Sequence, residues 1–165
     1  MAKTYENAEA VEALANVLIP THHPHLATAR IRYVFVDKAS TKGGKITAAS
    51  ATKITGVNQF LLDLDFVVMV ALDQWNPMTA EQRTALVDHE LEHCFGEEDP
   101  EDPGATMKWS MRSHDVQEFS SILRRHGAWN EDLQGFTEIA SQIDIADFDE
   151  PEQTEATQER QESHG

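Results

Sequence analysis

The stretch "ALVDHELEHCFGEED" (residues 85–99) decides how this chain of 165 residues folds and what site it can build. It holds His89, Glu90 and His93 in the order His-Glu-x-x-His, and an acidic run follows at once. Residues four apart on an α-helix lie on the same face, so both imidazoles can point at one metal ion. Glu90 then lies close enough to activate a water on that ion without being a ligand. The alternative interpretation is a solvated helix face that carries this pattern by chance.

The sequence around the motif predicts a capped helix behind a buried strand. Thr79 and Gln82 have capping-box spacing, so we expect the helix to begin there. It should run to about Phe95, with Gly96 as its C′ residue. The preceding segment "DFVVMVALD" (65–73) is nearly all apolar and β-branched, which predicts a central strand of the sheet.

The rest of the chain predicts an α+β domain over residues 1–146. Apolar residues at helical or alternating spacing give the other expected elements. These are helices over 7–19 (ended by Pro20), 115–127 and 130–143, and strands over 29–37, 45–55 and 105–111, the first two strands pairing as a hairpin around "KASTKGGK". Residues 147–165 are acidic and lack apolar periodicity, so we expect a disordered tail.

Composition limits the partners and the compartment. The chain has 29 acidic and 13 basic residues, a formal net charge of -16, which disfavours nucleic acid and anionic membrane surfaces as partners. It has one cysteine, Cys94, expected to be buried and inert, and its N-terminus lacks the pattern of a signal peptide. The longest apolar stretch, "FVVMVAL" (66–72), is too short to span a bilayer. We expect a soluble, cytoplasmic protein.

A catalytic zinc site needs a third protein ligand beside His89 and His93. Three residues are candidates. His114 opens "SHDVQEFSSILRRHG", Glu118 lies four residues later, and Asp99 has the position of the third ligand in the compact metzincin pattern. The residues alone leave all three open.

The segments "DHELEH" and "SHDVQEFSSILRRHG" resemble the phage metallopeptidase family and are similar to the SprT-like group of zincins. The match to the phage family runs from "HPHLATARIRYVFVD" through "DFVVMVALDQW" to "RRHGAW". The resemblance implies that His89, His93 and His114 bind Zn2+ and that Glu90 is the general base. It implies a zincin-like fold with an N-terminal helix, a small, mainly antiparallel sheet, the motif helix, and a second helix that carries the third ligand. It also implies a phage or prophage origin and a bacterial host cell.

Two functions from different classes fit these observations. The first is a zinc metallopeptidase that hydrolyses peptide bonds in a peptide or protein substrate, with Glu90 activating the attacking water. The second is a non-catalytic, acidic binding or inhibitor protein that mimics DNA or sequesters a host factor and keeps zinc for structure. Glu90 favours the first, because a purely structural site does not need it.

Overall fold

A computed structural model describes residues 2–104 and 106–146. The chain forms two compact units, Met1–Ser113 and a second that begins at His114. The single domain over 1–146 stays a prediction, and the expected tail over 147–165 lies outside the described residues. No helix in the described part of the chain is both long and apolar enough to cross a membrane.

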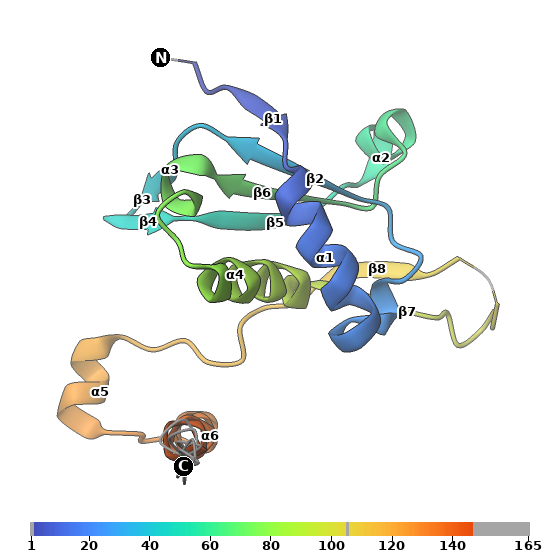
Figure 1. Cartoon of the computed structure of the whole chain (residues 1–165). Coiled ribbons are helices and arrows are strands. Elements are labelled where there is room, and N and C mark those ends of the chain that lie inside the picture. The colour runs from blue at the N-terminus through green and yellow to red at the C-terminus, as the bar shows by residue number, and fades with distance from the viewer. Residues whose placement is uncertain (1, 105, 147–165) are drawn as a thin grey trace, which may run out of the picture. The chain divides into compact units, whose positions relative to one another are not determined.

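The first unit is built on a mixed four-stranded sheet (Figure 1). Its order is β1 (Tyr5–Asn7), β2 (Ile31–Val36), β6 (Phe66–Ala71) and β5 (Ala49–Lys53). The central strands β2 and β6 pair in parallel, while the edge strands β1 and β5 pair antiparallel to them. The α+β class is therefore confirmed, and β6 is a central strand as its apolar sequence predicts.

Two helices, α1 (Glu9–His22) and α4 (Ala80–His93), pack against each other and against one face of this sheet (Figure 1). Alternation along the strands puts every second side chain on that face. The resulting core contains Val11, Ala15 and Leu18 from α1, Tyr33 and Phe35 from β2, Phe66, Val68 and Val70 from β6, and Val87 and Leu91 from α4. The core thus fixes the motif helix to the sheet.

Asp65 and Arg30 join the starting ends of the two central strands. The buried Asp65 carboxylate accepts hydrogen bonds from the Arg30 backbone N–H (2.8 Å), from the Arg30 guanidinium (2.8 and 3.1 Å) and from Gln59 (3.2 Å). Burial alone would raise the pKa of Asp65, but the hydrogen bonds outweigh it and hold that pKa below its usual range. Asp65 is therefore charged in the folded protein and stabilises the parallel pairing.

We expect Asp65→Asn to lower the free energy of unfolding by about 2–3 kcal/mol at pH 7, because charge-assisted hydrogen bonds are lost. The folded-state pKa of Asp65 is depressed, so its stabilisation is present above the unfolded-state pKa of about 3.9 and is lost as pH falls through the folded-state value. Denaturant unfolding between pH 7 and pH 2 should show the gap between the two proteins closing below about pH 4. The control is Asp63→Asn, at an exposed carboxylate that also pairs with Arg30. A gap that stays constant with pH would contradict this role.

Two sequence predictions for the first half of the chain are wrong in detail, and three short helices were not predicted. Helix α1 continues through Pro20, because the missing donor affects one bond near the helix end and the His23 N–H still donates to Ile19 O at 2.9 Å. The segment 45–55 is not the hairpin partner of β2. It forms β4 (Lys45–Thr47), which pairs with β3 (Ser40–Lys42), and then β5, which pairs with β6. Three further short helices, η1 (Pro24–Leu26), α2 (Gly56–Leu62) and α3 (Leu72–Trp75), have no apolar periodicity that would predict them.

The motif helix also ends earlier than its glycine predicts. Helix α4 stops at His93, and Cys94–Glu97 forms β7, which pairs with β8 (Lys108–Met111) as a two-stranded ribbon. Gly96 is a strand residue opposite Trp109, and a Cβ there would lie 2.3 Å from the Trp109 Cζ3. Gly96 is thus required for space, so that the indole can pack on Phe66 with ring centroids 5.7 Å apart.

The second unit contains α5 (Ser120–His126) and α6 (Glu131–Ala146). The helix expected over 115–127 begins later, because Phe119 is extended and serves as its N-cap residue. The Glu118 carboxylate accepts hydrogen bonds from the Phe119 N–H at 2.7 Å and the Trp129 Nε1–H at 3.0 Å. The first of these bonds satisfies the Phe119 backbone N–H at the start of α5 without another helical turn.

Candidate metal centre

The motif histidines lie in the last two turns of α4. The capping box at the other end is confirmed: Thr79 accepts from the Gln82 N–H at 3.2 Å, and Gln82 accepts from the Thr79 N–H at 3.0 Å. With the start of the helix fixed, the 3.6-residue repeat brings His89 and His93 to one side. Their ring centroids are 5.0 Å apart, with an interplanar angle of 82°.

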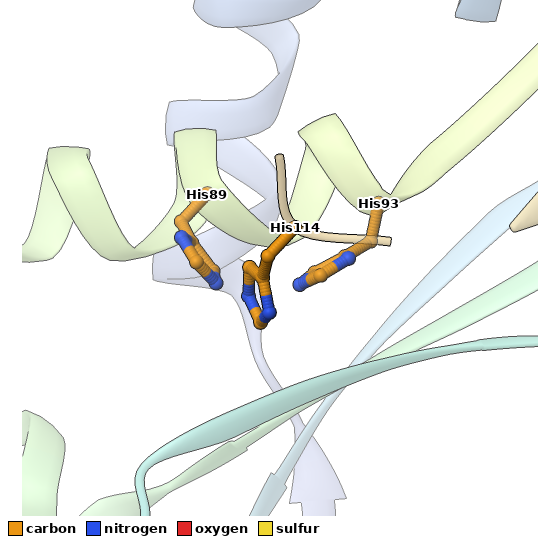
Figure 2. Close-up of side chains that lie close together, drawn as sticks. All are labelled: His89, His93 and His114. Atoms are coloured by element: carbon orange, nitrogen blue, oxygen red, sulfur yellow. The ribbon is translucent and has the colours of Figure 1, made fainter. Parts of the chain in front are cut away.

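His114 reaches the same place through the ribbon. Strands β7 and β8 lead the chain away from His93 and back, and the Arg112 N–H donates to the His93 carbonyl at 2.8 Å. One ring nitrogen from each of His89, His93 and His114 lies within 4.8 Å of the other two. Figure 2 shows the three imidazoles converging below the end of α4. A histidine 21 residues downstream thus joins the pair that the helix already aligns.

The carbonyl of Arg112 orients one of these rings. The His93 Nδ1 lies 2.7 Å from Arg112 O, and a carbonyl can only accept, so Nδ1 carries the proton in this contact. The Nε2 lone pair then remains for a metal, which is the usual tautomer of a metal-binding histidine held by a carbonyl. An ion pair between Arg112 and Glu92 fixes the same segment to α4.

Glu90 differs from the histidines because its side chain is buried, with 5% exposed. It shares the inner side of α4 with Val87 and Leu91, facing the sheet. Burial raises the pKa of Glu90, while the charge of His93 and a hydrogen bond from the Ala51 backbone N–H lower it in part. A carboxyl group with a raised pKa beside converging imidazoles is suited to accept a proton and to release it again.

The other two candidates for a third ligand lie elsewhere. Glu118 uses both carboxylate oxygens within the second unit, as described above. Asp99 accepts the Glu101 N–H at 3.0 Å, in the turn after β7. Among the described residues, only His89, His93 and His114 form a group that could hold a metal ion.

The sequence did not predict the role of His23, whose side chain contacts two carboxylates of α4. Its side chain is buried, with Nε2 2.6 Å from the Asp88 carboxylate and Nδ1 3.7 Å from that of Glu92. The segment "THHPHL" reads as a polar loop, and nothing in it distinguishes His23 from its neighbours. Cys94 is buried as expected, and burial together with the charge of Glu90 raises its thiol pKa to about 12, so it is unreactive.

The donor set fits a zinc ion. Nitrogen ligands bind zinc at about 2.0–2.1 Å, so two of them on one ion lie roughly 3.3 Å apart. The three ring nitrogens lie within 4.8 Å of one another, so they would have to move closer together to bind one ion. Imidazole is also a ligand for copper, iron and nickel. The three histidines therefore indicate a site for a transition metal, and they do not by themselves select zinc.

Comparison with known proteins places this site in a family. The profile of the family described as "Putative phage metallopeptidase" matches residues 3–140, which include every residue of the site. No curated protein and no solved structure matches the chain. The match spans both described units and most of the sequence, so the resemblance to the phage metallopeptidase family is confirmed. The chain belongs to the phage metallopeptidase family.

Proposed function

We propose that this protein is a zinc-dependent peptidase that hydrolyses peptide bonds in a peptide or protein substrate. One observation carries the proposal. The buried Glu90 lies on the same helix as His89 and His93, and His114 converges with these two histidines. A binding protein that used metal only for structure would gain nothing from a carboxylate with a raised pKa at this place. Membership of the family supports the same activity.

In this proposal, His89, His93 and His114 hold the ion, and Glu90 moves protons. Bound zinc would supply a polarised substrate carbonyl and a water of lowered pKa. Glu90 would take the proton from the attacking water and pass it to the nitrogen of the leaving amine. Its raised pKa suits both steps, because the group must accept a proton and then give it up.

The test is cleavage of a fluorescence-quenched peptide library by the purified protein, with and without a chelator. We expect cleavage that the chelator abolishes and that added Zn2+ restores. The fraction of zinc that the chelator removes should equal the fraction of cleavage activity that is lost, because each active site holds one ion. Capture of a host protein without cleavage of it or of any library peptide would favour the binding-protein alternative.

We further propose that the enzyme acts in the cytoplasm of a bacterial host.

A further inference from the structure

The side chain of His23 contacts both of the α4 turns that carry the motif histidines. Its Nε2 lies 2.6 Å from the Asp88 carboxylate, and its Nδ1 lies 3.7 Å from the Glu92 carboxylate. Asp88 directly precedes His89 in the chain, and Glu92 directly precedes His93. The four-residue spacing that aligns the two imidazoles on one side of α4 therefore aligns the two carboxylates on an adjacent side, where a single ring meets both.

The His23 ring is held on a fixed backbone. The His23 N–H donates to Ile19 O at 2.9 Å, and its carbonyl accepts from the Leu26 N–H at 2.8 Å. The side chain is 1% exposed, so water does not compete for its contacts. A carboxylate can only accept, so the His23 Nε2 carries a proton and donates it to Asp88 in a short, charge-assisted hydrogen bond.

Glu92 links the same histidine to the ring of a motif residue. Its carboxylate forms an ion pair with Arg112, and the Arg112 carbonyl accepts from the His93 Nδ1 at 2.7 Å. The contact between Glu92 and His23 is longer than a hydrogen bond, so the bond to Asp88 is the stronger of the two that His23 makes with α4. Both contacts lie within the first unit of the chain.

Resting on the metal site of the proposed function, we propose that His23 is a positioning residue for the metal centre. Through Asp88 and Glu92, it fixes the rotation of the last two turns of α4 about the helix axis. Rotation of these turns would move the rings of His89 and His93 together. Because zinc accepts ligands only within about 0.2 Å of their ideal distances, free rotation would weaken binding. Loss of His23 should therefore lower metal affinity and change the geometry at the metal.

The decisive variants are His23→Leu, which removes both ring nitrogens, and His23→Gln, whose amide can place an N–H where the Nε2–H lies. The matched control is His22→Leu, at the exposed neighbour in the last turn of α1. Zinc affinity is measured by chelator competition under conditions where circular dichroism shows each variant to be folded. We expect His23→Leu to bind zinc about 10- to 100-fold more weakly, the range for losing a residue that orients a ligand. His23→Gln and His22→Leu should stay close to the wild-type affinity.

Cobalt(II) in place of zinc gives a readout that a loss of stability alone would not change. The visible absorption of bound cobalt depends on the geometry of its ligands. We expect the spectrum of His23→Leu to differ from that of the wild type and the spectrum of His23→Gln to match it. A purely structural role predicts a lower unfolding midpoint for His23→Leu together with wild-type zinc affinity and a wild-type cobalt spectrum. That result overturns the proposal.

If His23→Leu does not fold, the same comparison is made from the other side of the hydrogen bond. Asp88→Ala removes the acceptor, whereas Asp88→Asn keeps an acceptor oxygen in the same place. We expect weaker zinc binding and an altered cobalt spectrum in Asp88→Ala, and values near those of the wild type in Asp88→Asn. Equal zinc affinity in Asp88→Ala and the wild type overturns the proposal.

These measurements separate the role of His23 from the proposed function, because neither uses a substrate. Weaker zinc binding by His23→Leu in a protein that cleaves no peptide supports the positioning role and overturns the peptidase activity. Unchanged zinc binding by His23→Leu in a protein that does cleave peptides overturns the positioning role and leaves the activity intact. A wild-type protein that binds neither zinc nor cobalt overturns both.

Discussion

Glu90→Gln is expected to lower the rate of peptide cleavage by about 100- to 10,000-fold, the range that a general base contributes. The amide keeps the shape of the buried side chain but cannot take a proton from water. Because the variant is uncharged, burial no longer penalises it, so fold and zinc content should be retained. The measurements are kcat/KM on a peptide cleaved by the wild type and zinc per protein by elemental analysis.

The acid side of the pH profile provides a second readout for Glu90. The base works only when ionised, and burial raises its pKa above the ordinary value for glutamate, about 4.3. Wild-type activity should therefore fall, as pH decreases, at a higher pH than an exposed glutamate would give. Glu81→Gln, at an exposed carboxylate in the first turn of the same helix, is the control and should change neither rate nor profile. Turnover retained by Glu90→Gln would end the proposed mechanism.

His114→Ala is expected to weaken zinc binding by about 100- to 1,000-fold. Structural zinc sites bind with about 10–16 kcal/mol from four ligands, so each ligand contributes roughly 3 kcal/mol. The affinity is measured by competition with a chromophoric chelator at fixed pH, because the histidines must lose protons to bind. Activity at saturating zinc should also fall, since the ion would gain an additional open position.

The controls for this experiment follow from the alternative ligands. Glu118→Gln and Asp99→Asn should leave the zinc affinity unchanged, because both carboxylates are hydrogen-bonded elsewhere. His126→Ala, at the exposed last residue of α5, controls for the loss of any histidine. An unchanged affinity in His114→Ala would remove this residue from the ligand set.

Local chemistry made the helix of the site predictable from sequence. Thr79 and Gln82 mark the start of α4 because a capping box involves only four consecutive residues. The alignment of His89 and His93 follows from the helical repeat alone. The apolar run 65–73 likewise reveals β6 as a central strand, and every residue of β6 is buried or half-buried.

Long-range contacts explain what the sequence could not show. Glycine after a helix usually marks its end, but Gly96 is selected by the bulk of Trp109, a residue that becomes its neighbour only once the ribbon has formed. The pairing of β5 with β6 depends on β2 having taken the other side of β6, which is a property of the whole sheet. Similarly, His23 is buried because of Asp88, 65 residues away.

Because β7 and β8 pair as a ribbon, the turn that joins them can change in length while the positions of the histidines stay the same. Its first pair, Cys94 and Met111, adjoins the histidines, and its last pair, Glu97 and Lys108, lies three residues farther along each strand. Residues inserted into the turn beyond Glu97, for example after Asp102, add only about 0.6 kcal/mol of closure entropy per doubling of the loop. We therefore expect that an affinity tag or a fluorescent label can be inserted there, and that relatives can differ in length there, without moving the three histidines.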